Sequence, residues 1–381
     1  MSIEIHGTVA PGYEGVRDAF AANWEHHGEV GASLSATVGG ETVVDLWGGT
    51  ATFDDGERDW EEDTLINVWS TTKTMSFLCC LLLADRGELD LYEPIATYWP
   101  EFGAAGKDRV ATRHVLSHDA GLSGWDEPLE PNDLLDHDKL VALHAAQEPW
   151  WEPGTGSGYH AISQGYLLGE IVKRISGRSL GRFFADEIAG PLGADFHIGT
   201  GPEHDDRIAH VIPPSDPLGA DTGVLQPGSI AVRTLANPAL DAAFSSTKEW
   251  RRAEIPAAGG HGNARSVAAI HTLTANGGTA NGHQIISPDG LARIFDEQTR
   301  GIDRVLGVDL VLGMGFGLPG PALPLPNPHT CYWGGWGGSL AIIDQDSALS
   351  YSYVMNKMAS TTTGDLRGAG PLLALYGALA A

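Results

Sequence analysis

Ser70-Thr71-Thr72-Lys73 is the stretch on which the interpretation of this sequence depends. It follows a short run expected to be extended, residues 66–69, and opens an unbroken apolar run, residues 74–84, that Gly87 ends. This pattern predicts a short strand followed by a buried helix with a C-terminal glycine. Because residues three apart share a helical face, the Lys73 amine can reach the Ser70 hydroxyl, beside the free N–H groups of the helix start. A partly buried lysine has a lowered pKa and can act as a base toward a serine nucleophile.

The context of this S-x-x-K sequence separates it from the alternative, a serine helix cap followed by a surface lysine. Its flanks, Val68-Trp69 and residues 75–83, are apolar, which argues against a solvated face for Lys73. A second S-x-x-K, residues 245–248, leads into the polar run Glu249-Trp250-Arg251-Arg252 and is interpreted as a solvated helix start. We therefore expect the nucleophile at Ser70 and not at Ser245.

Two further patterns are interpreted as structural. Gly177-Arg178-Ser179-Leu180-Gly181 matches G-x-S-x-G, but a nucleophile elbow needs a strand before the serine, and a helix is expected there. Gly177 suits a helix C-terminus, and Ser179 suits the cap of the next helix. His114 and His118 are four apart, as two metal ligands on one helix face would be, but neither an H-E-x-x-H pattern nor a third ligand accompanies them. We expect structural histidines and no metal site.

Strand patterns occur at both ends of the chain. Residues 31–38 and 42–48 alternate around Gly39-Gly40, and residues 340–343 and 349–355 flank residues 344–346, so each pair predicts a hairpin. Helices are expected at residues 13–27, 162–175 and 366–380. The pattern predicts an α+β fold: an antiparallel sheet built from both termini and flanked by helices, with a mostly helical inserted domain. The expected sheet domain is 1–84 with 251–381, the helical domain is 85–250, and the active site lies between them.

The composition excludes several classes of function. With 42% hydrophobic and 19% charged residues, the 381-residue chain is typical of a globular protein. A formal net charge of −26 leaves no basic surface for nucleic acid or for a membrane, and no apolar run is long enough to span a bilayer. The N-terminus lacks a signal-peptide pattern, and the cysteines are three, with Cys79 and Cys80 adjacent. We therefore expect a cytoplasmic protein without disulfides.

Two glycine-rich segments add candidate site residues. Residues 153–158 lead into Tyr159 just before the helix expected at residue 162, where the phenol can be aimed at a site and act as a base beside a lysine ammonium. A tyrosine packed at a helix start is an equal alternative. Residues 333–339, Trp-Gly-Gly-Trp-Gly-Gly-Ser, precede a strand, and the N–H groups of such a backbone can hold an oxyanion. The alternative for this second segment is a bulge or tight turn.

Taken together, these motifs resemble the serine β-lactamase and penicillin-binding-protein superfamily, and most closely its esterase branch, the family VIII carboxylesterases related to class C β-lactamases. Ser70-Thr71-Thr72-Lys73 resembles the first motif, and residues 114–122, His-Val-Leu-Ser-His-Asp-Ala-Gly-Leu, resemble the family's His-Leu-Leu-Thr-His-Thr-Ser-Gly-Leu stretch. Trp151-Glu152-Pro153-Gly154 leading to Tyr159 resembles the second motif, and Trp333-Gly334-Gly335 stands in place of the third. The resemblance covers nearly the whole chain.

The resemblance implies a role for each residue. Ser70 is the nucleophile, Lys73 with Tyr159 activates it, and the backbone N–H groups of Ser70 and Trp336 form the oxyanion hole. Contacts to the substrate are expected from Trp333, Gly334, Gly335, Trp151 and His160. The reaction needs no metal or cofactor: Ser70 attacks an ester carbonyl, the alcohol leaves with a proton through Tyr159, and water hydrolyses the acyl-enzyme.

Two departures from class C β-lactamases shape the expected substrate. Ala161 stands where those enzymes have the Asn of Tyr-x-Asn, and Trp333 stands where their third motif begins with Lys. The Asn holds a side-chain amide of the substrate, and the Lys draws its carboxylate. We therefore expect a serine carboxylesterase whose small-molecule partner is a neutral, short-to-medium ester. The alternatives are a β-lactamase, D-amino-acid peptidase or acyltransferase of the same fold, or a non-catalytic penicillin-recognising module, against which the intact Ser70, Lys73 and Tyr159 argue.

Overall fold

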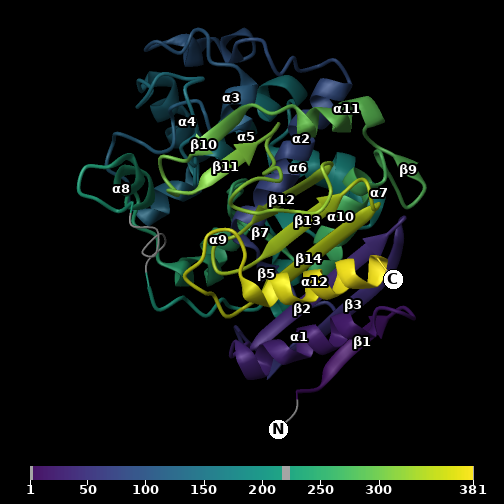
Figure 1. Cartoon of the computed structure of the whole chain (residues 1–381). Helices are drawn as coiled ribbons and strands as arrows, with labels where there is room; N and C mark the ends of the chain where they lie inside the picture. Colours follow the sequence, from purple (N-terminus) through teal and green to yellow (C-terminus); the bar gives the residue numbers. More distant parts are fainter. Residues whose placement is uncertain (1–2, 217–223, 381) are drawn as a thin grey trace.

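A seven-stranded sheet built from the two ends of the chain is the centre of the fold (Figure 1). The computed structural model describes residues 3–216 and 224–380, and the expected elements are compared with it over these residues. The strand order is β1-β3-β2-β14-β13-β12, with β4 paired to β3, and every pairing is antiparallel. The predicted fold class is confirmed. The strands are β1 (Ile5–Val9), β2 (Gly31–Val38), β3 (Glu41–Phe53), β4 (Gly56–Asp59), β12 (Thr330–Gly334), β13 (Leu340–Asp344) and β14 (Leu349–Met355).

Both predicted hairpins are present in this sheet. The β2–β3 turn places Gly39 at φ 59° and Gly40 at φ 90°, the left-handed conformations that a tight two-residue hairpin turn requires. Strand β14 pairs with β2, with Tyr353 opposite Leu34, so it joins the N-terminal hairpin to the C-terminal one. The strands β2, β13 and β14 are buried along nearly their whole length because helices cover both faces of the sheet.

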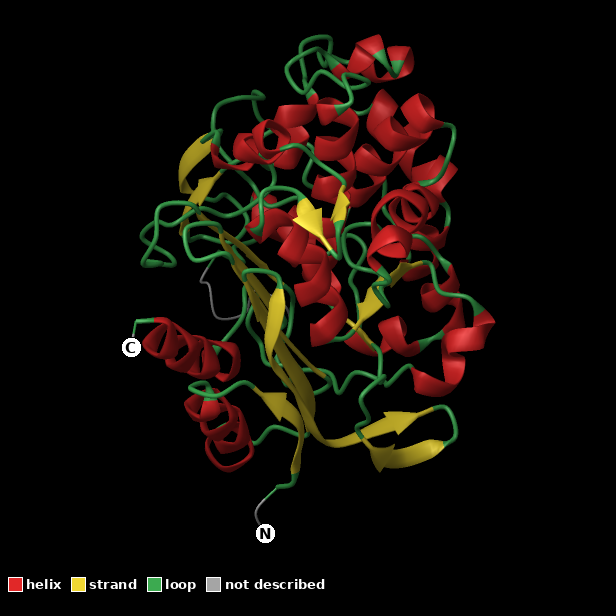
Figure 2. Ribbon diagram, turned by 90° about the vertical axis from the view of Figure 1, so that its right-hand side faces the viewer, coloured by secondary structure: helices red, strands yellow, loops and turns green. Residues whose placement is uncertain are grey.

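The two faces of the sheet carry different helices (Figure 2). Helices α1 (Glu14–His26) and α12 (Leu366–Leu379) pack together on one face, and α10 (Ala264–Ala275) packs on the other against β2, β13 and β14. Helices α1 and α12 fall where the sequence predicts them, at residues 13–27 and 366–380. The mostly helical part of the chain lies beyond α10, on the same side of the sheet.

A buried ion cluster fastens the outer helix layer to the sheet. The Arg367 guanidinium, at the start of α12, lies 3.1 Å from the fully buried Glu29 carboxylate and 2.6 Å from Asp365. It also donates 2.6 Å hydrogen bonds to the carbonyls of Lys357 and Gly337. Glu29 precedes β2 and Gly337 lies in the β12–β13 turn, so one side chain connects both ends of the chain. A buried charge is tolerated when it is paired and hydrogen-bonded in this way.

The middle of the chain supplies most of the helices. Helix α2 (Lys73–Asp85) is fully buried over residues 73–84 and packs against α5, α6 and α11. The other helices are α3 (Thr112–Leu116), α4 (His137–Ala146), α5 (Ser163–Ser176), α6 (Leu180–Phe184), α7 (Gly190–Leu192), α8 (Ile230–Leu235), α9 (Lys248–Arg252) and α11 (Pro288–Ala292). Within the described ranges, no helix is both long and apolar enough to cross a membrane.

Short strands connect the helical part to the sheet. They are β5 (Ile66–Asn67), β6 (His197–Ile198) and β7 (Gly260–Gly262) in one sheet, β8 (Thr279–Ala280) with β9 (His283–Gln284), and β10 (Thr299–Ile302) with β11 (Asp309–Leu312). Strand β6 lies within residues 85–250 but pairs with β7, beyond residue 250. This pairing crosses the expected boundary at residue 250. The division into domains at residues 84 and 250 stays a prediction.

Candidate active site

The nucleophile candidate, Ser70, lies in a single 3₁₀ turn, η1 (Trp69–Thr72), that leads directly into α2. The extended run ends at Asn67, two residues earlier than predicted, because Trp69 turns the chain with a φ of 50°. A left-handed conformation is unfavourable for a bulky residue, and here packing offsets it. The Trp69 ring lies 4.8 Å from the ring of Trp336 and 5.6 Å from that of Trp250.

The Lys73 amine is fully enclosed beside Ser70. Its Nζ lies 3.1 Å from Ser70 Oγ, 2.7 Å from the carbonyl oxygen of Ala161 and 2.9 Å from that of Ala257. No carboxylate forms an ion pair with Lys73 in the part of the chain that the structure describes. Burial therefore lowers the pKa of Lys73 well below its usual value, because the charged form loses its hydration.

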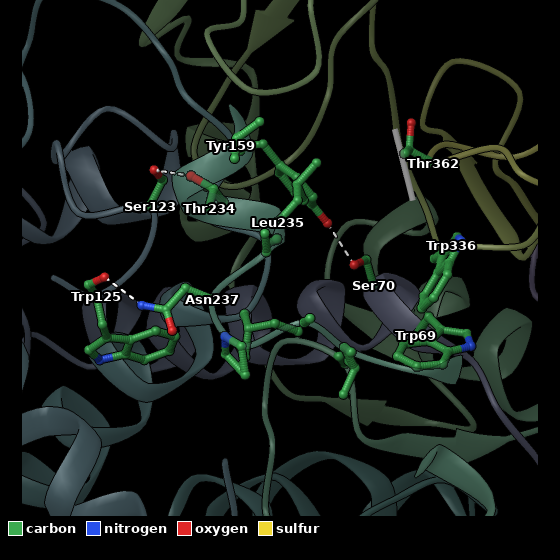
Figure 3. A pocket seen from close by; sticks show the side chains of 18 of the residues that line it. Trp69, Ser70, Ser123, Trp125, Tyr159, Thr234, Leu235, Asn237, Trp336 and Thr362 are labelled. Carbon is green, nitrogen blue, oxygen red and sulfur yellow. Dashed lines mark hydrogen bonds between the residues drawn. The ribbon is translucent and has the colours of Figure 1, made fainter. Parts of the chain in front are cut away.

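The Tyr159 phenol is a second side chain that contacts Ser70. Its OH donates a 2.6 Å hydrogen bond to Ser70 Oγ (Figure 3). Its ring centroid lies 4.9 Å from Lys73 Nζ. Burial raises the pKa of Tyr159 above its usual value, and the hydrogen bond to Ser70 opposes that rise only in part. This direction disfavours the phenolate base considered from the sequence and favours a phenol that donates a proton. The structure thus brings Ser70, Lys73 and Tyr159 together as predicted.

Trp333, Trp151 and His160, three of the predicted substrate contacts, pack around the Tyr159 loop. None of them lines the cavity that opens beside Ser70. Trp333 is stacked on His118 with ring centroids 5.3 Å apart and lies 6.0 Å from the Tyr159 ring. Trp151 covers Gly158, where an added Cβ would lie 2.6 Å from its ring. These aromatic rings support the loop that carries Tyr159, so the expected direct contacts of Trp333 and Trp151 are replaced by a packing role.

His160 is the clearest correction among the predicted contacts. It is fully buried; its Nδ1 lies 2.7 Å from the carbonyl of Gly158, and its Nε2 accepts a 3.2 Å hydrogen bond from the N–H of Leu122. Burial lowers the pKa of His160 to about 3, so the ring is neutral. Both ring nitrogens are occupied within the protein, and the prediction that His160 contacts substrate is wrong.

The turn between β12 and β13 packs against the backbone of Ser70. A Cβ added to Gly335 would lie 3.2 Å from Ser70 N, 2.5 Å from the carbonyl of Val68 and 2.3 Å from Ser339 Oγ. Ser339 Oγ donates a 2.8 Å hydrogen bond to that Val68 carbonyl and so ties the turn to η1. Ser70 N belongs to the first turn of η1, where N–H groups lack helical partners, and the Trp336 N–H donates to none of the described residues. Gly334 likewise has no room for a side chain, since its Cβ would meet the backbone of Thr363 at 2.6 Å.

A cavity of about 290 Å³ opens beside Ser70 and Tyr159 (Figure 3). No charged side chain lines it within residues 3–216 and 224–380. Its polar residues are largely satisfied by one another: Ser123 and Thr234 share a 2.7 Å hydrogen bond, and Asn237 donates to the carbonyl of Trp125 at 2.8 Å. The lining includes Ala161, Trp69 and Trp336, and an apolar wall from Ile162, Leu225, Val232, Leu235, Ala236, Pro238, Ala239, Leu240 and Ala258.

Sequence reasoning missed this wall. It comes mainly from α8 and the residues after it, which carry no motif and lie far from Ser70 in the chain. The only available signal was the apolar content of residues 230–240, which is equally typical of a core segment.

The structure largely agrees with the structural interpretation of the G-x-S-x-G match and of the second S-x-x-K. Gly177 ends α5 with a φ of 72°, and Ser179 caps α6 by accepting from the N–H of Arg182, so the G-x-S-x-G match is no nucleophile elbow. In the second S-x-x-K, Lys248 is 63% exposed, as predicted. The run that follows it is only partly solvated, however, because Glu249 is exposed but Trp250 and Arg251 are fully buried.

The histidine pair His114 and His118 does not form a metal site. Nδ1 of His114 accepts from the N–H of Ala111, and Nδ1 of His118 accepts from the N–H of His160, each at 3.0 Å. His118 also lies beyond the end of α3, with a φ of 59°, so the two residues do not share a helix.

A different group, Asp195, His197 and His204, has ligand atoms within 4.8 Å of one another among the described residues. Arg207 already occupies it, donating to Asp195 Oδ1 and to His204 Nδ1 at 2.9 Å each. The cluster is therefore an ion-paired structural element in this structure.

The chain is similar to known proteins over nearly its whole length. The Beta-lactamase family model matches residues 16–375. The crystal structure of a family VIII carboxylesterase superimposes with a TM-score of 0.91 at 42% identity, covering 99% of this chain and 100% of that one. A penicillin-binding-protein homologue from Caulobacter crescentus gives a TM-score of 0.90 at 36% identity, covering 98% and 100%. Esterase/beta-lactamase LipL of Mycobacterium tuberculosis is 33% identical over 372 residues, which are 93% of this chain and 84% of LipL. The chain therefore belongs to the β-lactamase family and, within it, to the family VIII carboxylesterase branch.

Proposed function

We propose that this protein is a serine carboxylesterase that hydrolyses neutral, short-to-medium esters through an acyl-enzyme on Ser70. The observation that carries the proposal is the position of Ser70 Oγ, 3.1 Å from Lys73 Nζ and 2.6 Å from the Tyr159 OH, beside a cavity whose described lining includes no charged side chain. The similarity to a family VIII carboxylesterase and to an esterase/beta-lactamase supports the same class of reaction.

Lys73 is the proposed base for the attack. A neutral amine has two N–H bonds and one lone pair, and two carbonyl acceptors, those of Ala161 and Ala257, lie within 2.9 Å of Nζ. With both N–H bonds used there, the lone pair is left for the Ser70 hydroxyl proton. Desolvation favours this neutral form, which is the form that a base requires.

Tyr159 is the proposed proton donor to the departing alcohol. Its raised pKa keeps the phenol protonated, and its OH already points at Ser70 Oγ, beside the position of the leaving oxygen. The tetrahedral oxyanion would be held by the N–H groups of Ser70 and Trp336, which need no reorganisation when the charge develops. Water then attacks the acyl-enzyme and gives a proton to the Tyr159 phenolate, while the Lys73 ammonium returns a proton to Ser70 as the acid is released.

The uncharged cavity supports neutral over anionic substrates. A carboxylate that leaves water for this cavity would meet no cation among the described lining residues, and each missing charge-assisted contact costs about 1.5–3 kcal/mol. We also propose a reducing, cytoplasmic location, because Cys79, Cys80 and Cys331 are all buried and unpaired.

Covalent catalysis at Ser70 is tested with a fluorophosphonate probe. The protein should be labelled at one site, and Ser70→Ala should abolish both labelling and p-nitrophenyl ester turnover. Ser179→Ala and Ser245→Ala are matched controls, since each removes a serine from a similar motif, and both should be labelled normally. Mass mapping of the adduct to Ser179 or Ser245 would contradict the proposal.

The role of Lys73 is tested by the pH dependence of kcat/KM. The active form is the deprotonated amine, so activity should be lost as pH falls through the lowered pKa of Lys73 and should stay high above it. Lys73→Arg, whose guanidinium stays protonated, should lose at least about a hundredfold at every pH. Lys248→Arg in the second S-x-x-K is the control and should match the wild type. A Lys73→Arg enzyme with near-normal turnover would exclude Lys73 as the base.

The oxyanion turn is tested by Gly335→Ala. The added methyl group would collide with the Val68 carbonyl and Ser339 Oγ and so push the turn away from Ser70 N. Loss of one oxyanion donor lowers kcat by about 10²–10³, and KM should change far less. Gly370→Ala, on α12 with no atom within 4 Å of the added Cβ, is the control. Equal kcat values for the two folded variants would argue against an oxyanion hole in this turn.

The substrate class is tested with a panel of p-nitrophenyl esters beside nitrocefin. Short and medium esters should be cleaved with kcat/KM orders of magnitude above that of nitrocefin, and EDTA should have no effect. Leu235→Lys introduces a cation into the cavity wall and should raise the nitrocefin-to-ester ratio about tenfold. The control Leu373→Lys lies on the surface, where Leu373 is 72% exposed, and should leave the ratio unchanged. If the wild type cleaves nitrocefin as fast as its best ester, the esterase proposal fails.

A further inference from the structure

The turn after β10 carries a buried carboxylate that contacts the Tyr159 loop. Asp303 is 1% exposed, and its Oδ1 accepts hydrogen bonds from the N–H groups of Val305 and Leu306, each at 2.9 Å. The same oxygen accepts a 3.0 Å hydrogen bond from the Tyr159 N–H. The two residues are 144 positions apart in the chain, so this bond joins two separate parts of the fold.

The neighbouring Arg304 strengthens the same junction. Its backbone N–H donates to the carbonyl of Ser157 at 3.0 Å, and its guanidinium donates to the carbonyl of Thr155 at 3.2 Å and lies 5.3 Å from the ring of Trp151. The guanidinium is therefore used by the Tyr159 loop, and Asp303 has no ion-pair partner among the described residues. A carboxylate buried without a cation is costly unless N–H groups hold it. Three N–H groups bind Oδ1 of Asp303, whereas its Oδ2 is buried without a partner among the described residues.

We propose that Asp303 is a positioning residue for Tyr159: by holding the Tyr159 N–H, it fixes the backbone from which the phenol reaches Ser70. The inference rests on the proposed function of Tyr159 as proton donor. A displacement of about 1 Å at a catalytic group is enough to cost about a hundredfold in rate. The negative charge of Asp303 also opposes ionisation of the phenol, although burial is the larger cause of the raised pKa of Tyr159.

The test is a double-mutant cycle between Asp303→Ala and Tyr159→Phe, measured with p-nitrophenyl and alkyl esters of the same acid. Asp303→Ala should lower kcat for the alkyl ester about 30- to 100-fold with KM changed less than about threefold. The p-nitrophenyl ester should suffer less, because its leaving group needs no proton. In the Tyr159→Phe background, Asp303→Ala should have no further effect, since both changes remove one function.

Two variants separate this role from a general effect on the fold. Asp303→Asn keeps an oxygen that accepts from the Tyr159 N–H and should stay within about fivefold of the wild type. Asp309→Ala removes a carboxylate from the same hairpin, β10–β11, and should leave both esters unaffected. If Asp303→Ala fails to fold, Asp303→Ser takes its place. The serine hydroxyl can still accept from the N–H groups of the turn, but the side chain is one bond shorter and so holds the Tyr159 N–H less well.

Several results would overturn the inference. They are a folded Asp303→Ala enzyme with wild-type kcat, equal losses for both leaving groups, and a full further loss in the Tyr159→Phe background. Failure of both the Ala and Ser variants to fold would also overturn it, since Asp303 would then serve the fold. A fully active Tyr159→Phe enzyme is a different outcome, because it refutes the proposed role of Tyr159 itself. An inactive Tyr159→Phe enzyme together with a normal Asp303→Ala enzyme refutes only the positioning role of Asp303.

Discussion

The enclosure of one lysine amine, without a carboxylate partner, is the constraint on which the rest of the site depends. Lys73 Nζ is held by groups from three separate segments: Ser70 from η1, Ala161 from the loop before α5, and Ala257 from the loop before β7. Taking an ammonium out of water is costly, so the surroundings select the neutral amine. The tight packing that encloses Lys73 therefore also favours the neutral amine that we propose as the base.

The electrostatics of the site differ from those of the whole molecule. The chain carries a formal net charge of −26, yet the described lining of the cavity carries no charge, and Lys73, whose amine contacts Ser70, is favoured in its neutral form. A negative surface repels anions at a distance, and an uncharged cavity offers them no compensation on arrival. Both features support the proposed preference for uncharged esters, and they do so by independent means.

Local patterns predicted much of the fold because they carry their own geometry. Gly39-Gly40 determines a hairpin turn, Gly177 a helix end, and the run after Lys73 a buried helix, and each of these needs only neighbouring residues. Ser70, Lys73 and Tyr159 were predicted from ordered motifs, and the structure brings them into contact. The positions of His160 and Asp303 depend on tertiary contacts instead. The burial of His160 and the bond from Asp303 to Tyr159 arise from segments distant in the chain, for which the sequence contains no periodic signal.

The pairing of β2 with β14 imposes an order on biosynthesis. Strand β2 ends at Val38 and β14 begins at Leu349, so the N-terminal hairpin leaves the ribosome about 300 residues before its partner strand. At about 5–20 residues per second this interval is about 15–60 s, during which one edge of β2 has no strand beside it. An unpaired strand edge is a template for aggregation. The nascent chain therefore exposes this strand edge until β14 leaves the ribosome, and the edge needs transient shielding over that period.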